Sequence, residues 1–151
     1  MPTRHEGSDA ERGALDLMIK LARASDTFLG RLAGPVQECG LTMSGFGVLE
    51  TLWHLGPLRP TEIAAKHLRS RNNLTVVIDH LERDGLIERV KCPNDRRAHH
   101  VHLTSEGRAR IEDAFPRFLI GLVREASVLT REEQGQLSDL LRKLGQGSPE
   151  V

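Results

Sequence analysis

The chain has 151 residues and a formal net charge of zero, from 21 Lys and Arg against 21 Asp and Glu. A chain of this length can bury a sizeable core, and with 3% aromatic residues and no Tyr that core must be aliphatic, which suits helices. The scarcity of aromatic rings disfavours a protein that stacks single-stranded bases. No stretch approaches the roughly 20 apolar residues of a membrane span, and the N-terminus lacks the apolar segment of a secretory signal. We therefore expect a cytoplasmic protein.

The zero net charge conceals a polarised sequence. Residues 59–110 contain 11 Lys or Arg and 7 Asp or Glu, whereas the rest of the chain contains 10 and 14. A local surplus of positive charge is what a nucleic-acid partner requires, and a total charge of zero does not argue against it.

The N-terminal third predicts two helices. Apolar residues recur at three- and four-residue steps between Leu15 and Leu32, which predicts a long amphipathic helix over about residues 10–33, ended by Gly34-Pro35. A second helix is expected after an N-cap at Thr42 or Ser44, and Gly56-Pro57 closes it. Trp53 on this helix is more simply a core residue than part of a ligand pocket.

Residues 60–85 predict a helix, a turn and a second helix. The first is short, with Thr61 as its expected N-cap. The second begins after Ser70 as N-cap and ends at Asp84-Gly85, because glycine tolerates the left-handed conformation that closes a helix. Its apolar positions repeat at helical spacing and so form one buried stripe, while the opposite face looks outward. The stripe consists of Leu74, Val77, Ile78 and Leu81.

A hairpin and two further helices are expected next. Residues 86–92 and 98–103 alternate apolar and polar side chains around Pro93-Asn94-Asp95, a turn signal. A two-stranded hairpin is marginal alone, so it must lean on the preceding helices. Thr104 is the predicted N-cap of a helix to about Ser127, and Thr130 with Glu133 forms a capping box for a last helix. The expected fold is mainly α with a small β-hairpin wing: a winged helix-turn-helix plus terminal helices.

Two runs in this region carry a family resemblance. LERDGLIERV (81–90) and DRRAHHVHLTSEG (95–107) resemble the hallmark of the MarR family of bacterial transcription regulators: a recognition helix ending in Leu-Glu-x-x-Gly-Leu, a wing with Asp-x-Arg and a closing Leu-Thr-x-x-Gly. The matching positions are Leu81, Glu82, Gly85, Leu86, Asp95, Arg97, Leu103, Thr104 and Gly107.

The resemblance implies a homodimer that binds double-stranded DNA. Residues 8–34 and 104–145 would form a helical dimerisation region, and residues 41–103 the winged helix-turn-helix DNA-binding region. The apolar stripes of the terminal helices also need a surface to cover. In the dimer, two of these DNA-binding regions, which we call readers, would be related by symmetry and would bind a pseudo-palindromic site. The resemblance further implies a repressor that a small phenolic or lipophilic effector releases from DNA, and no cofactor is expected.

Candidate DNA contacts come from the recognition helix and the wing. In a major groove, Arg suits guanine, Asn suits adenine, and Val or a Thr methyl suits the thymine methyl. On the wing, two adjacent guanidiniums can enter the minor groove, where Asp95 can orient one of them; the resemblance assigns that groove to Arg97. The alternative is that these polar residues only cap a helix and solvate a turn. The candidates are Arg69, Arg71, Asn72, Asn73, Thr75, Val76, Arg89, Lys91, Asp95, Arg96 and Arg97.

Other functions remain as alternatives. His99, His100 and His102 near Cys92 suggest a metal site, but no further ligand completes a tetrahedral set, so none is expected. Cys39 precedes a predicted helix, whose N-terminus can lower a thiol pKa; it is either a redox sensor or, more simply, a buried inert thiol. A winged helix can also serve as a protein-interaction module, although the basic wing argues against that. Motifs of an enzyme are absent.

Overall fold

The computed structural model describes residues 4–66 and 73–147, in which six helices and two strands follow one another along the chain. Their bounds are α1 (Asp9–Glu38), α2 (Met43–Leu55), α3 (Pro60–Lys66), α4 (Leu74–Arg83), β1 (Ile87–Cys92), β2 (Asp95–Leu103), α5 (Ser105–Ala126) and α6 (Arg131–Gln146). The predicted fold class, mainly α with a β-hairpin, is confirmed.

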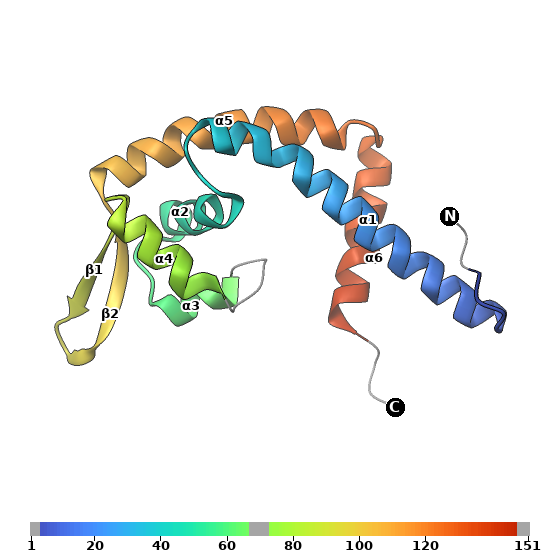
Figure 1. Cartoon of the computed structure of the whole chain (residues 1–151), viewed down its shortest axis with the longest axis horizontal. Helices are drawn as coiled ribbons and strands as arrows, with labels where there is room; N and C mark the ends of the chain where they lie inside the picture. The colour runs from blue at the N-terminus through green and yellow to red at the C-terminus, as the bar shows by residue number, and fades with distance from the viewer. Residues whose placement is uncertain (1–3, 67–72, 148–151) are drawn as a thin grey trace.

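The helices form an arch with the hairpin at one end (Figure 1). The long helices α1 and α5 pack against each other along the top, and α2 lies beneath them, in contact with both. Below α2 lie α3, α4 and the β1–β2 hairpin. The N-terminal half of α1 and the whole of α6 lie on the side of α2 away from the hairpin. The hairpin and α6 therefore lie on opposite sides of α2, while α1 and α5 pack directly on α2 (Figure 1).

The core is aliphatic, as the composition predicted, and it is centred on α2. Each large aliphatic side chain that is fully buried contributes about 1.5–3 kcal/mol relative to an exposed one, so this cluster fixes how the hairpin and α4 sit on α2. Side chains with at most 2% exposure are Leu32, Val36, Val48, Leu49, Leu52, Ile63, Ile78, Leu86, Ile87, Val101, Ile111 and Ala114.

The predicted end of the first helix at Gly34-Pro35 is wrong, because α1 continues to Glu38. Proline disfavours a helix interior because it lacks an amide hydrogen and crowds the preceding turn. Here tertiary packing compensates: Val36 is fully buried, and the Pro35 ring lies against Gly121 of α5. The helix instead ends at Glu38, with Cys39 as its C-cap, and Gly40 follows with a positive φ of 73° that suits a glycine.

Most of the predicted N-caps are confirmed. Thr42, Thr104 and Thr130 each accept a hydrogen bond from the backbone amide three residues on, and Thr130 with Glu133 forms the full capping box. The N-cap predicted at Thr61 is wrong, because α3 begins at Pro60, two residues before the start that this cap would give. Proline suits the first helical position, since its missing amide hydrogen would have no partner there. Ser70 lies outside the described residues.

The β1–β2 hairpin is antiparallel and is attached to the core through Val101. Ile87 pairs with Leu103 and Lys91 with His99, and an irregularity follows between Lys91 and Cys92. In the middle of β2 the Val101 amide donates to the Leu58 carbonyl at 2.8 Å, and the Leu58 amide donates back at 3.3 Å. The segment between α2 and α3 thus adds a third, short stretch of pairing, which answers the expectation that the hairpin must lean on the helices.

Candidate nucleic-acid interface

Helix α4 has one buried face and one exposed face, as its periodicity predicted. Leu74, Ile78 and Leu81 are buried against the core, whereas Asn73, Thr75 and Val76 are exposed at the start of the helix. Val76 keeps 50% of its surface exposed, so its methyl groups are accessible at the start of the helix. The candidates Arg69, Arg71 and Asn72 lie outside the described residues.

The junction between α4, the hairpin and α5 is built from the residues that carry the family motif. Gly85 has a φ of 75° and ends α4, and the Thr104 hydroxyl donates to the Gly85 carbonyl at 2.6 Å. The Thr104 amide donates to the Leu86 carbonyl at 3.1 Å. Gly107 lets α5 approach this turn, because a Cβ there would lie 1.8 Å from the Leu86 oxygen. The motif therefore fixes where the wing starts relative to the recognition helix.

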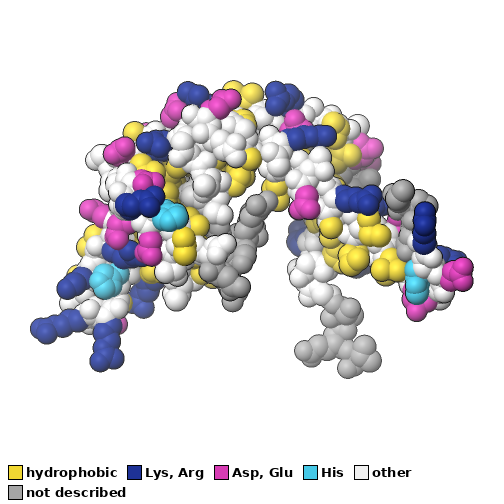
Figure 2. Space-filling model, in the orientation of Figure 1, with side chains coloured by type: hydrophobic (Ala, Val, Ile, Leu, Met, Phe, Trp, Pro, Cys, Tyr) yellow, Lys and Arg dark blue, Asp and Glu magenta, His cyan; other side chains and the backbone are white. Residues whose placement is uncertain are grey.

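At the wing tip, Asp95 stabilises the turn. Its carboxylate accepts a hydrogen bond from the Arg97 backbone amide at 3.0 Å, an arrangement typical of Asp in tight turns. The orienting bond to a guanidinium that the sequence suggested is therefore replaced by a bond to the backbone. The side chains of Lys91, Arg96 and Arg97 are exposed, and Lys and Arg side chains project from the end of the hairpin in Figure 2.

Lys91, Arg96 and Arg97 of the wing differ from many other cations of the described residues in having no acidic partner. Arg83, Arg108 and Arg110 each pair with a carboxylate within 4 Å. Across residues 4–66 and 73–147, by contrast, no carboxylate pairs with five cations of the reader region. These are Arg59, Lys66, Lys91, Arg96 and Arg97. Their charge is uncompensated, as a surface that attracts phosphates requires.

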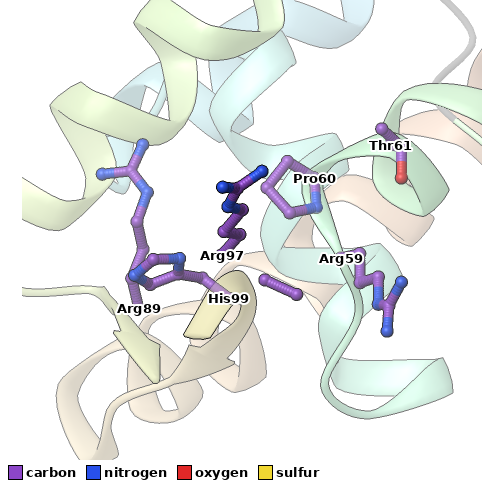
Figure 3. Close-up of a pocket in the computed structure, with 7 residues that line it drawn as sticks. Arg59, Pro60, Thr61, Arg89, Arg97 and His99 are labelled. Carbon is purple, nitrogen blue, oxygen red and sulfur yellow. The ribbon is translucent and has the colours of Figure 1, made fainter. Parts of the chain in front are cut away.

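A cavity of about 350 Å³ separates the hairpin from the start of α3. It is lined by Arg59, Pro60, Thr61, Arg89, Arg97, Ala98 and His99. In Figure 3 the Arg97 side chain reaches toward Pro60, while the Arg59 guanidinium points away from it on the far side of that ring. Arg59 was not among the predicted contacts. Arg59 lines this cavity only because the start of α3 packs beside the hairpin, and no motif in the sequence indicates that contact.

Arg89 is the one cation of β1 that is strongly paired in the described part of the chain. Its Nη2 lies 2.6 Å from Asp79 Oδ1 and its Nη1 lies 2.6 Å from Glu82 Oε1. The hydrogen bond to Asp79, with help from Glu82, raises the pKa of Arg89 above its usual value. Both carboxylates belong to α4, so this arginine ties the wing to the recognition helix. A phosphate contact of Arg89 stays a prediction from the sequence.

Both cysteines are free thiols. Cys92 Sγ lies 2.7 Å from His100 Nδ1 across the hairpin, but the described residues contain no group of three or more His, Cys, Asp or Glu able to hold a metal ion. Cys39 caps the C-terminal end of α1 and is 9% exposed. Burial raises the pKa of its thiol, which is opposite to the lowering that a helix N-terminus could have produced.

The fold and its basic wing define a winged helix-turn-helix transcription regulator. The model of the MarR family matches residues 41–99. An uncharacterized HTH-type transcriptional regulator of Bacillus subtilis, YkoM, is 34% identical over 87% of this chain and 86% of its own length. The HTH-type transcriptional regulator MhqR of the same organism is 31% identical, over 87% of this chain and 91% of its own. The chain belongs to the MarR family.

A solved structure supports the same assignment. Sco3205, a MarR family transcriptional regulator from Streptomyces coelicolor in complex with DNA, is 25% identical, and the match covers 95% of this chain and 96% of that one with a TM-score of 0.82. The family consists of transcription regulators, so the chain is not an enzyme. None of the helices that the structure describes is both long enough and apolar enough to span a membrane.

Proposed function

We propose that the protein is a homodimeric repressor that binds a pseudo-palindromic duplex and is released from it by a small effector. One observation carries the DNA-binding part of this proposal: uncompensated cations gather on the wing, beside the exposed start of a recognition helix that is anchored to the core. Phosphates are the partner that such a surface selects. The alternatives, a protein-interaction module or a thiol-based sensor, have no comparable observation in their favour, and the raised pKa of Cys39 counts against that thiol as a sensor.

In the proposed complex, two elements read two grooves. The recognition helix enters the major groove, where its first residues approach base edges. The wing enters the adjacent minor groove, which has the stronger negative potential where it is narrow. The proposed major-groove residues are Arg69, Arg71, Asn72, Asn73, Thr75 and Val76. The proposed wing contacts are Lys91, Arg96 and Arg97, with Asp95 shaping the turn.

Unburied apolar side chains on the terminal helices support a homodimer. None of the residues of α6 is buried, although this helix has 16 residues and a regular apolar stripe. An amphipathic helix of this kind needs a surface to cover, and a second copy supplies the matching stripe by symmetry. Exposed apolar residues of α1, α5 and α6 are Leu17, Met18, Leu21, Leu119, Ile120, Val123, Leu137, Leu140, Leu141 and Leu144. We therefore propose that α1 and residues 104–145 form the dimerisation region.

An aromatic cluster between α2 and α5 supports the effector part of the proposal. The Trp53 ring lies 5.2 Å from Phe115 and 4.8 Å from His54, and the Phe46 and Phe118 rings lie 4.7 Å apart. Trp53 is only partly buried. The exposed part of the Trp53 ring can stack against an added aromatic ring. A phenolic or lipophilic effector bound between the dimer helices and the reader would contact this cluster and shift the angle of the reader.

A binding measurement across salt concentrations tests the DNA-binding proposal. The wild-type protein selects a duplex from a random-sequence library, and its affinity for that duplex is measured by gel shift. We expect steep weakening with salt, and Arg97→Ala should lower the slope by about 0.9, the value for one lost phosphate contact. Arg142→Ala, on exposed α6, is the control and should leave the slope unchanged. A complex that is insensitive to salt, or no selected duplex at all, would refute the proposal.

A further inference from the structure

The wing and the recognition helix are joined by a charged bridge that the family motif does not explain. Arg89 stands in the middle of β1, opposite Val101, and its two terminal nitrogens each donate to a different carboxylate of α4, at 2.6 Å. Its side chain is 29% exposed. A planar guanidinium can make two such bonds in fixed directions, which an ammonium group cannot. The bridge therefore restricts the angle between the two elements.

The two acceptors lie on the side of α4 that faces the wing. Asp79 and Glu82 are three residues apart, so their side chains share one face of the helix. Their side chains are 56% and 40% exposed. Left unpaired, two carboxylates at this position would repel the phosphates that the neighbouring cations attract. Arg89 offsets this repulsion and holds both groups against the hairpin.

The same arginine could instead bind DNA directly, as its place in the sequence suggests. The pairing argues against this role, because both terminal nitrogens already donate to carboxylates and would have to give up 2.6 Å bonds to reach a phosphate. Lys91, two residues further along β1, is exposed and has no carboxylate partner within the described part of the chain. Lys91 is therefore available for a phosphate, whereas Arg89 is committed to α4.

We propose that Arg89 is a positioning residue for DNA binding: it acts through Asp79 and Glu82, by locking the wing to the recognition helix and by neutralising their charge, and does not contact a phosphate itself. This inference rests on the proposed DNA-binding function. It predicts that the effect of losing Arg89 depends on whether the two carboxylates are present.

A mutant cycle tests this dependence. The four proteins are the wild type, Arg89→Gln, the pair Asp79→Asn with Glu82→Gln, and the triple variant, measured on the duplex that the wild type selects. We expect Arg89→Gln alone to weaken binding about tenfold or more. In the background without carboxylates the same change should alter affinity by no more than about twofold, the scatter of independent effects. Thermal unfolding and circular dichroism confirm that each variant is folded.

Three results would overturn the inference. If Arg89→Gln weakens binding by the same factor in both backgrounds, Arg89 is a direct contact. If it has no effect in the presence of both carboxylates, the bridge does not matter for binding. If Arg89→Lys, which keeps the charge but cannot bridge both carboxylates, binds as well as the wild type, positioning is unnecessary. Failure of the wild type to bind any duplex would instead refute the proposed function, so the two failures are distinguishable.

Discussion

Replacing Gly107 with alanine tests whether the junction between the wing and α5 is as tight as the structure shows. A Cβ at this position would lie 1.8 Å from the Leu86 carbonyl oxygen, whereas ordinary contacts begin at 3.4 Å. The neighbour is backbone, so it cannot rotate away as a side chain could. Helix α5 must therefore move away from the turn after α4, and the bond from the Thr104 amide to that same oxygen, 3.1 Å long, must stretch or break.

The expected magnitude follows from three contributions. Overpacking at a buried site costs about 1–3 kcal/mol, and the strained hydrogen bond costs about 1 kcal/mol. Alanine gains up to about 1 kcal/mol over glycine in a helix. The net expectation for Gly107→Ala is a loss of about 2 kcal/mol in the free energy of unfolding, although helix propensity alone would predict a gain.

Urea unfolding at one fixed protein concentration measures this change, since the stability of a dimer depends on concentration. Gly135→Ala is the matched control. Gly135 also lies inside a helix, has no atom within 4 Å of its added Cβ, and is on the opposite side of α6 from Leu137 and Leu144. The free energy of unfolding of the Gly135→Ala variant should rise by up to about 1 kcal/mol. If Gly107→Ala is as stable as the wild type or more so, the close approach at this junction is refuted.

Three further predictions concern the terminal helices and the buried thiol. Leu140→Glu, at a side chain 64% exposed on α6, should convert the proposed dimer into a monomer in sizing experiments, because a carboxylate cannot be buried unpaired. Arg142→Glu, on the opposite side of the helix from Leu137 and Leu144, should remain dimeric, and a dimeric Leu140→Glu would contradict the proposed interface. Thr130→Ala removes a capping box and should lower the free energy of unfolding by about 1 kcal/mol, and an unchanged urea midpoint would show that this cap is dispensable. Burial raises the pKa of Cys39, so its contribution to stability is present below the unfolded thiol pKa of about 8.5 and is lost as pH rises above it. Cys39→Ser should therefore flatten the fall in urea midpoint between about pH 8 and pH 10, and iodoacetamide should label half-exposed Cys92 first.

The features that could be predicted from the sequence depend on local pattern. The caps at Thr42, Thr104 and Thr130 and the stop at Gly85 are settled by a few neighbouring residues, and the structure has each of them. The buried stripe of α4 follows from helical spacing alone. The exposed cations at the wing tip could also be predicted, because a short polar loop between two strands projects into solvent.

The features that the sequence did not reveal depend on contacts between distant elements. Proline at position 35 predicts a helix end, and only the packing of Val36 and of the ring against α5 allows α1 to continue. Arg89 looked like a free cation because its acceptors, Asp79 and Glu82, are ten and seven residues away on another element. The Cys39 thiol was placed near a helix start, yet it caps the end of α1, because that helix is longer than its pattern indicates.

The arrangement separates two geometric requirements of a symmetric DNA-binding protein. The angle between the wing and the recognition helix is fixed by contacts within one reader. These are the backbone pairing of Leu58 with Val101, the hydrogen bond from the Thr104 hydroxyl to the Gly85 carbonyl, and the Arg89 bridge. In the proposed dimer, the distance between the two readers is set by α1, α5 and α6. Of the contacts above, only the Thr104 hydrogen bond lies next to one of these helices, at the start of α5. An effector that tilts α5 against α2 would therefore change the half-site spacing, about one turn of DNA, and would leave each reader intact. With the effector bound, the protein should then keep its affinity for DNA that carries a single half-site and lose its affinity for DNA that carries both half-sites.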